Sequence, residues 1–233
     1  MVRLYIIGDN MQINKIYNID CFEGMKRIEN KSVDLILTDI PYGECNGRDN
    51  EGIRKINKGD ADIVSFEIPN LVSELLRVCK GSIYIFCGTE QASEIIHEMR
   101  KNGLTTRLCI WEKPNPSPLA GEFMWLSNIE CCVFGRFAKA TFNEFCKGSV
   151  WRCNCGSSKI HPTQKPLELF KRLILASSNV GGLVLDPFSG SGTTAVACNH
   201  LHRNFIAFEK NELFYKASVK RYNEETAQLS LIL

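Results

Sequence analysis

Two glycines near the C-terminal end of the chain form a pattern that could bind a nucleoside. Gly190, Gly192 and Ala195 fit the pattern G-x-G-x-x-A and lie between a short apolar run and a helical pattern. Glycines in such a turn let a nucleotide approach the backbone at the N-terminus of a helix. Glu209 follows about 20 residues later, where an acid can accept hydrogen bonds from ribose hydroxyls. The alternatives are a tight turn without a ligand and an exposed acid at a strand end.

A second group of residues lies in the first quarter of the chain. Asp39, Pro41 and Tyr42 follow the apolar run Val33–Thr38. Such a run is expected for a strand that helices cover on both faces. Ligands of an open α/β sheet bind beyond the carboxyl ends of its strands, so Asp39 and Asp186 should face the same crevice. Taken alone, an acid, a proline and an aromatic residue after a strand also occur in ordinary turns.

Alternating strands and helices must position these residues. Short apolar runs alternate with helical patterns, which is typical of a parallel α/β sheet. The helical spacing of apolar residues is clearest between Ile68 and Cys79. Strands are expected at residues 15–19, 33–38, 82–87, 104–111, 128–135, 183–185 and 205–208. Helices are expected at residues 22–28, 68–79, 92–102, 166–180 and 193–200.

The glycine pattern stands at an unusual place in this order. A dinucleotide-binding sheet normally begins with its glycine loop and continues for many strands. Few residues follow Glu209 here, so the remaining strands must come from the N-terminal side. This arrangement is circularly permuted, and a nicotinamide-dependent oxidoreductase has no reason to be built in this way. No lysine follows the glycines, which excludes a Walker loop.

Three segments resemble motifs of the DNA amino-methyltransferases, which methylate exocyclic base amines with S-adenosylmethionine. Asp39-Ile40-Pro41-Tyr42 is similar to their Asp-Pro-Pro-Tyr motif, with isoleucine where the family usually has proline. Residues 186–194 resemble their cofactor loop, and the segment His-Pro-Thr-Gln-Lys-Pro at residues 161–166 resembles the segment before that loop. The catalytic motif precedes the cofactor loop, which is the order of the beta group.

The resemblance extends from about Asn18 to Tyr222 and implies a Rossmann-like methyltransferase fold of the α/β class. This fold would be circularly permuted, with a mostly parallel central sheet and helices on both faces. We expect residues 1–233 to form a single methyltransferase domain. A loop at about residues 43–62 is expected to be mobile and to contact DNA, and a short basic segment at about residues 136–158 to recognise the target.

The charge distribution agrees with a nucleic-acid partner without requiring one. The net charge of the whole chain is only +2. Residues 136–172, however, hold eight Lys or Arg and two Glu. Such a stretch could form a phosphate-binding face or an ordinary solvated surface.

The chemistry of base methylation accounts for the residue types of the first motif. An exocyclic amine shares its lone pair with the aromatic ring and is a poor nucleophile. By resemblance, the Asp39 carboxylate and the backbone carbonyl of Ile40 accept hydrogen bonds from the two N–H groups and free the lone pair. Tyr42 would stack on a base rotated out of the duplex. Pro41 keeps residue 40 extended, so Ile40→Pro should be tolerated if only the carbonyl is used.

The resemblance implies S-adenosylmethionine as the cofactor. Its contacts are expected from Asp20, His161, Thr163, Lys165, Asp186, Pro187, Phe188, Ser189, Gly190, Ser191, Gly192, Thr193 and Glu209. Some of these assignments have alternatives. Asp20 could instead cap the next helix, and His161 and Lys165 could lie in a basic surface loop. Residues 111–116 resemble the family segment that lines the target-base pocket, although Trp111 could equally belong to the core.

An acid at position 39 favours adenine, because the cytosine-amine enzymes of the family usually carry serine there. The expected function is site-specific methylation of the adenine amine in double-stranded DNA after base flipping. Three alternatives stay open: a cytosine-N4 enzyme, a protein-amide methyltransferase, and a DNA-binding homologue that has lost catalysis. A cognate restriction endonuclease and a homodimer are left open as partners.

The composition agrees with a cytoplasmic enzyme. The chain of 233 residues is 44% hydrophobic and 23% charged, which is ordinary for a globular protein and excludes a disordered one. No apolar run approaches the roughly 18 residues that cross a bilayer, so no membrane partner is expected. Eleven cysteines without a secretion signal argue against a disulfide framework. Cys146, Cys153, Cys155 and His161 match no common zinc spacing, so no metal is expected.

Overall fold

The computed structural model describes residues 6–7, 11–43, 64–116, 122, 125–155 and 164–229. The loop expected to be mobile at about residues 43–62 lies outside these ranges except for Gly43. His161 and Thr163 also lie outside them, and the basic segment is described as far as residue 155. Within the described ranges, no helix has the length and apolar character needed to cross a membrane.

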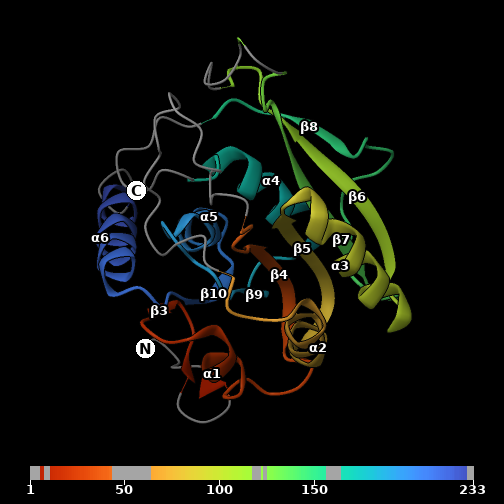
Figure 1. The fold of residues 1–233 in the computed structure, drawn as a ribbon. Coiled ribbons are helices and arrows are strands. Elements are labelled where there is room, and N and C mark those ends of the chain that lie inside the picture. The colour runs from red at the N-terminus through yellow and green to blue at the C-terminus, as the bar shows by residue number, and fades with distance from the viewer. Residues whose placement is uncertain are drawn as a thin grey trace.

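An eight-stranded sheet forms the centre of the molecule (Figure 1). In spatial order its strands are β3 (Lys15–Tyr17), β10 (Asn204–Phe208), β9 (Leu183–Asp186), β4 (Val33–Asp39), β5 (Cys79–Cys87), β7 (Ile129–Arg136), β6 (Thr105–Glu112) and β8 (Val150–Arg152). Neighbours are parallel along the row from β3 to β5, and β8 is parallel to β6. Only β7 runs antiparallel to both of its neighbours. The sheet is therefore mostly parallel, which confirms the expected class.

Helices cover both faces of this sheet (Figure 1). The helices on one face are α1 (Cys21–Met25), α2 (Ile68–Val78) and α3 (Thr89–Lys101). Those on the other are α4 (Leu167–Ser177), α5 (Thr193–His200) and α6 (Glu212–Leu229). A short antiparallel pair, β1 (Ile6–Ile7) and β2 (Met11–Gln12), stands apart from the main sheet.

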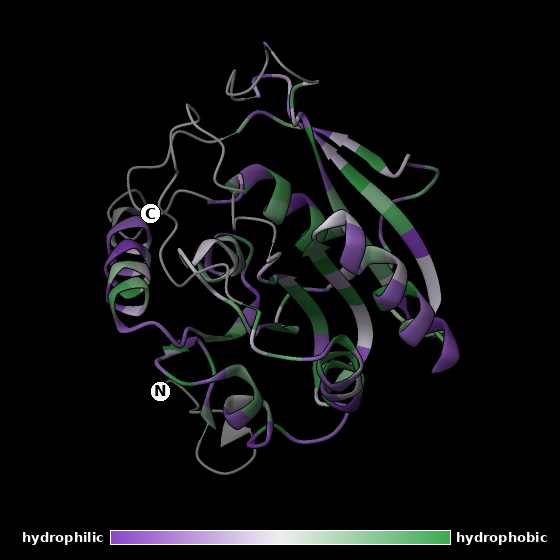
Figure 2. Cartoon of the chain, in the orientation of Figure 1, coloured by the Kyte–Doolittle hydropathy of each residue, from purple (hydrophilic) through white to green (hydrophobic). Residues whose placement is uncertain are grey.

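The central strand β4 shows why its sequence is almost continuously apolar. Leu35 and Leu37 pack into the core on the side of α4, whereas Ile36 packs into the core on the side of α2. All three side chains are fully buried. Figure 2 shows largely hydrophobic central strands and hydrophilic stretches along the surrounding helices. Burial on both faces removes the alternation of polar and apolar residues that a half-exposed strand would have.

The chain reverses its direction of travel across the sheet between β4 and β9. From β4 it passes through α2 to β5 on one side, and from β9 it passes through α5 to β10 on the other. The two strands lie next to each other, with Ile36 opposite Leu185. A crevice at the carboxyl ends of strands forms at such a switch point. The glycine loop follows β9, and β4 precedes β9 in the chain. The order of the strands along the chain is therefore circularly permuted relative to a sheet that begins with its glycine loop, as the sequence predicts.

Some element boundaries differ from those predicted from the sequence. The apolar pattern predicts a helix to Cys79 and a strand from Ser82, whereas α2 ends at Val78 and β5 begins at Cys79. The residues at this junction are buried on either side of the boundary, so apolar spacing does not mark it. Strand β8 has only three residues, and the apolar residues of α6 do not repeat clearly at helical spacing. Neither element is predicted by the apolar pattern.

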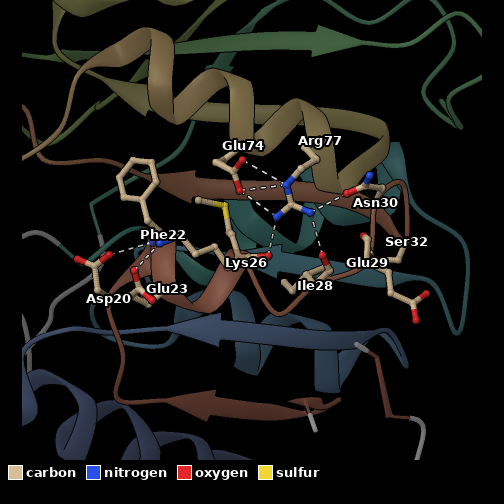
Figure 3. Close-up of polar contacts among 11 residues, drawn as sticks. Asp20, Phe22, Glu23, Lys26, Ile28, Glu29, Asn30, Ser32, Glu74 and Arg77 are labelled. Atoms are coloured by element: carbon tan, nitrogen blue, oxygen red, sulfur yellow. Dashed lines mark hydrogen bonds and ion pairs between the residues drawn. The ribbon is translucent and has the colours of Figure 1, made fainter. Parts of the chain in front are cut away.

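Arg77 near the end of α2 fixes the segment that follows α1 (Figure 3). Its guanidinium donates to the carbonyl oxygens of Met25 (2.7 Å) and Ile28 (3.0 Å) and to Oδ1 of Asn30 (2.7 Å). Glu74, one turn earlier on α2, pairs with the same guanidinium at 2.9 Å. These bonds hold α1, and with it the residues at its N-terminus, against the body of the molecule.

Candidate active site

A cavity of about 850 Å³ opens at the carboxyl ends of β4 and β9. The turn after β4 contributes Asp39 and Tyr42, and the segment after β9 contributes Asp186 and Gly190. Glu209, directly after β10, lies in the same wall. The volume is within the range of roughly 300–1,000 Å³ that is usual for small-molecule sites. The two sequence motifs therefore face one crevice, as their positions after parallel strands predict.

The loop between β9 and α5 turns at its two glycines. The φ angles of Gly190 and Gly192 are 49° and 76°, a region that glycine adopts at little cost. A Cβ atom at Gly192 would lie 3.2 Å from Cβ of Ser218, so this glycine allows α6 to pack closely. A Cβ atom at Gly190 would meet nothing within 4 Å. From α6, Arg221 donates to the carbonyl of Ser191 at 3.1 Å and holds the loop from behind.

Asp186 supports this loop from below. Its carboxylate accepts hydrogen bonds from the hydroxyls of Thr38 (3.0 Å) and Thr194 (2.5 Å) and from the backbone N–H of Phe188 (3.2 Å). The residue is 3% exposed, and burial raises the pKa of its carboxyl to about 7. Asp186 thus ties the loop to β4 and α5, and a direct contact with the cofactor stays a prediction.

The carboxylate of Glu209 connects the end of β10 to the glycine loop. Oε2 accepts the N–H of Gly190 at 2.9 Å, and Oε1 accepts the N–H of Asn211 at 2.8 Å. Burial raises the pKa of this carboxyl. An acid merely exposed at a strand end would have neither bond, so that alternative is wrong. Each oxygen keeps a lone pair toward which a ribose hydroxyl could donate.

The cavity wall fits the cofactor implied by the sequence motifs. Ser189 Oγ is buried and has no hydrogen-bond partner among the described residues, so it is available to a polar ligand. Phe66, just before α2, and Phe188 have ring centroids 5.3 Å apart and give the cavity an aromatic side. The open space beside Gly190 lets a ligand approach the backbone. Hydroxyl-binding and aromatic groups of this kind match a nucleoside such as that of S-adenosylmethionine.

Asp20 is both a helix cap and a residue of the cavity wall. Its Oδ1 accepts the N–H of Phe22 at 3.0 Å at the start of α1 (Figure 3). Lys210 pairs with the other oxygen at 3.3 Å. The cap that the sequence left as an alternative is therefore present, and the expected cofactor contact stays a prediction.

Five polar side chains, two of them from the motif after β4, form a connected cluster. Lys165 Nζ lies 2.6 Å from Asp39 Oδ2, 2.9 Å from Glu130 Oε2 and 3.0 Å from the hydroxyl of Tyr42. That hydroxyl donates to Asp39 Oδ1 at 2.6 Å. Lys113 pairs with the other oxygen of Glu130 at 2.6 Å. The cluster therefore contains two carboxylates and two ammonium groups.

Burial and charge act against each other within this cluster. Burial raises the pKa of Asp39 despite the nearby Lys165 ammonium. Burial alone would lower the pKa of Lys165, but the charges of Asp39 and Glu130 raise it. Burial would likewise raise the pKa of Glu130, but Lys165 and Lys113 lower it. Lys165 is thus a stable cation, and Asp39 is the carboxyl of the cluster that takes up a proton more readily.

The structure places Lys165 at the carboxylate of Asp39. The resemblance assigns it to the cofactor, and a basic surface loop is the alternative. A side chain that is 5% exposed and bound by two carboxylates excludes the surface loop. A contact with the cofactor stays a prediction.

Ile40 is fixed in ways that a proline at that position could not reproduce. Its backbone N–H donates to the carbonyl of Phe86 at 3.1 Å, and its side chain is 2% exposed in the core. Gln91 of α3 donates to the carbonyl of Pro41 at 2.9 Å. The turn after β4 is therefore held by β5 and α3 rather than by a second proline ring.

Two charged residues of the site are not singled out by the sequence motifs. Glu130 is the second residue of the apolar strand β7, and an acid near a strand end is usually a surface residue. Lys113 lies in the segment 111–116, which the resemblance associates with the target-base pocket. In the same segment Trp111 is 2% exposed and donates from Nε1 to the carbonyl of Cys153 at 2.7 Å. Trp111 therefore belongs to the core, which was its alternative assignment.

The basic stretch is partly paired within the protein. Arg172 binds Glu144 at 2.9 Å, and Arg136 donates to the carbonyl of Ala140 at 2.8 Å. With Lys165 buried, these cations are less available to phosphates than their number suggests. DNA contact by this stretch stays a prediction. No three His, Cys, Asp or Glu side chains within the described part of the chain are placed to hold a metal ion.

Comparisons with known proteins agree with the geometry of the site. A family model described as DNA methylase matches residues 139–220. The Type II methyltransferase M2.MboI of Moraxella bovis is 30% identical, over 98% of this chain and 94% of its own length. The crystal structure of an M1.HpyAVI–SAM complex superimposes with a TM-score of 0.70 at 29% identity, covering 89% of this chain and 98% of that one.

A more distant solved structure extends the likeness of the fold. The cytosine-N4-specific PvuII DNA methyltransferase has a TM-score of 0.68 over 96% of this chain and 94% of its own, at 15% identity. The permuted sheet, the crevice and these relatives lead to one conclusion. The chain belongs to the family of S-adenosylmethionine-dependent DNA amino-methyltransferases.

Proposed function

We propose that this methyltransferase modifies the N6 amine of adenine in double-stranded DNA, after the base has left the helical stack. The observation that carries the proposal is the Asp39 carboxylate, which lines the cavity beside Tyr42. By the resemblance described above, an acid at this position is typical of the adenine enzymes, whereas the cytosine enzymes usually have serine.

The proposed chemistry needs two acceptors for one amine. The Asp39 carboxylate and the Ile40 carbonyl would accept the two N–H groups, which draws the nitrogen toward tetrahedral geometry and frees its lone pair. The hydrogen bond from Ile40 to Phe86 and that from Gln91 to Pro41 hold the turn that aims the carbonyl. Fixed acceptors of this kind need no reorganisation when the reaction occurs.

Other residues that line the cavity would bind the cofactor. Glu209 is suited to the ribose hydroxyls, and Ser189 Oγ and the backbone near Gly190 to other polar groups. S-adenosylmethionine, when bound, supplies an electrophilic methyl group. The chain's own task is to hold the target amine in line with that group and to exclude water.

The target base is tested by incubating the chain with DNA and labelled S-adenosylmethionine, followed by mass spectrometry of the nucleosides. N6-methyldeoxyadenosine is the expected product, and N4-methyldeoxycytidine would establish the alternative. Cofactor binding without methyl transfer would indicate a homologue that has lost catalysis.

Asp39→Ala tests the role of the carboxylate. Transfer should fall by roughly 100-fold or more, because an acceptor aimed at the reacting amine is lost. Affinity for S-adenosylmethionine, measured by calorimetry, should stay close to that of the parent. Normal turnover would contradict the assigned role.

We also propose that residues 1–233 act as one domain and that the segments at about 43–62 and 136–158 contact DNA. A cognate endonuclease and a homodimer remain predictions. Sequencing methylated positions in DNA from cells that express the chain would identify the recognition sequence. Light scattering of the purified protein would give its oligomeric state.

A further inference from the structure

One buried ammonium group is shared by two carboxylates at the catalytic motif. Lys165 Nζ binds Asp39 Oδ2 at 2.6 Å and Glu130 Oε2 at 2.9 Å. The Lys165 side chain is 5% exposed, and those of Asp39 and Glu130 are 22% and 20% exposed. Lys113 holds the far oxygen of Glu130 at 2.6 Å. The four charges balance, so the cluster is neutral as a whole.

This arrangement competes with the reaction proposed for Asp39. Its Oδ2 binds Lys165, and its Oδ1 accepts the hydroxyl of Tyr42 at 2.6 Å. Each Asp39 oxygen keeps a second lone pair, but a target amine that donates there crowds against one of these donors or replaces it. The two donors differ in the partner that remains when Asp39 is lost: Glu130 lies 2.9 Å from the Lys165 ammonium but 3.4 Å from the Tyr42 hydroxyl, so the ammonium is the donor that can leave.

An ammonium displaced from Asp39 needs another partner at once. An unpaired buried charge is costly, and removing one partner of a buried pair typically costs about 3–5 kcal/mol. Glu130 already lies within hydrogen-bond distance of Lys165 and is itself held by Lys113. The ammonium can therefore leave Asp39 without losing its counter-charge and without crossing the cavity.

We propose that Glu130 is a positioning residue for methyl transfer, which retains the Lys165 ammonium when the target amine replaces it on Asp39. This inference rests on the proposed role of Asp39 as acceptor of the amine. The exchange transfers no atom: one N–H···O contact to Asp39 replaces another, and the charge of the cluster is unchanged. Glu130 acts through Lys165 and does not itself touch the base.

The charges around Asp39 determine how Glu130 affects its titration. Lys165 and Tyr42 bind it directly, Glu130 approaches from β7, and Asp186 from β9. The buried thiol of Cys132 also faces it, and burial raises the pKa of that thiol, which keeps it neutral. The negative charge of Glu130 raises the pKa of Asp39. Glu130→Gln should therefore lower that pKa and let the active, ionised form of Asp39 persist at lower pH.

The experiment compares Glu130→Gln and Glu130→Asp with the parent. The matched control is Glu98→Gln, which changes a partly buried glutamate of α3 that pairs with Lys101 and does not line the cavity. Single-turnover methyl transfer to a DNA duplex is measured across pH, and affinity for S-adenosylmethionine by calorimetry. For Glu130→Gln we expect a transfer rate at least about tenfold lower at neutral pH. In the pH profile of this rate, the acid limb should shift to lower pH. The affinity of the variant for S-adenosylmethionine should stay within twofold of that of the parent.

Glu130→Asp keeps the negative charge and should therefore retain most of the parent's transfer rate. The acid limb of its pH profile should lie near that of the parent. This variant also decides the matter if Glu130→Gln does not fold. A Glu130→Gln rate equal to that of Glu98→Gln would overturn the proposal. So would a slow Glu130→Gln variant whose acid limb does not move, because that is the signature of a purely structural defect. Asp39→Ala, assayed in parallel, tests the proposed function separately: an active Asp39→Ala variant refutes the proposed function itself.

Discussion

The backbone N–H of Gly190 donates to the carboxylate of Glu209 at 2.9 Å, so the acid after β10 and the glycine loop after β9 form one unit. In the sequence pattern the two residues are separate contributors to a nucleoside site. In the structure the acid also holds the loop that it faces. Substitution of Glu209 therefore affects two sets of contacts at the same time.

Substitution of Glu209 should weaken cofactor binding in graded steps. Glu209→Ala loses both the ribose acceptor and the bond to Gly190, and we expect at least a tenfold rise in the Kd for S-adenosylmethionine. Glu209→Gln keeps one acceptor oxygen, so its Kd for S-adenosylmethionine should rise less. Calorimetry measures both. Glu224→Gln, on the exposed surface of α6, is the control, and an alanine variant that binds like this control would refute the assignment.

Ile40→Pro should destabilise the protein, although it restores the usual family residue. Proline has no N–H to donate to Phe86, and the isoleucine side chain leaves the core. We expect a loss of roughly 1–3 kcal/mol in the free energy of unfolding. Ile40→Val keeps the N–H and should lose about 0.5–1.5 kcal/mol. Urea denaturation compares them, and a proline variant as stable as the parent would show that the hydrogen bond contributes nothing.

Asp186 should make stability depend on pH. Burial raises the pKa of its carboxyl from 3.8 to about 7, so the folded protein binds this proton more tightly than the unfolded chain does. The contribution of this group to the free energy of unfolding therefore falls as pH rises from about 4 to about 7, by roughly 4 kcal/mol at most. Asp186→Asn removes this dependence, and its stability relative to the parent should be greater at pH 8 than at pH 5. Equal differences at both values, measured with urea, would contradict the shifted titration.

Arg77→Ala should affect both stability and the cofactor site. The guanidinium holds the segment after α1, and α1 begins at Asp20 in the cavity wall. We expect a loss of roughly 2–3 kcal/mol in unfolding free energy and a weaker affinity for S-adenosylmethionine. Lys26→Ala removes an exposed ion pair with Glu23 on the same helix and should change little. An Arg77→Ala variant no less stable than Lys26→Ala would show that these bonds do not anchor α1.

Much of the sheet can be predicted from the sequence because its strands are buried on both faces. The run Val33–Thr38 and the helix from Ile68 have patterns that only a few packing arrangements satisfy. The position of the glycine loop late in the chain then indicates the permuted order. The direct passage from α2 to β5 is not predictable in this way, because the apolar residues on either side of Val78 suit both elements.

Residues of the candidate site that belong to sequence motifs can be predicted from the sequence. Residues that join the site only through contacts in the folded protein cannot. Asp39 and Glu209 stand at strand ends in recognisable patterns. Glu130 is one acid at the start of an apolar strand, and nothing in its neighbourhood in the sequence indicates Lys165. Their contact depends on β7 lying beside β5, which is a property of the folded sheet. Side chains far apart in the chain form the cluster, and no local pattern records it.

The place of β9 beside β4 has a consequence for how the protein is made. The ribosome synthesises β4 and β5 long before β9 and β10, yet β9 pairs with β4 in the middle of the sheet, and β10 pairs with β3 from the beginning of the chain. The early strands β3 and β4 therefore have an unpaired edge until β9 and β10 have been synthesised, and unpaired edges of this kind favour aggregation. Pairings between such distant segments also slow folding. Expression at low temperature, or with chaperones that shield strand edges, should raise the yield of this enzyme more than that of an unpermuted sheet of equal size.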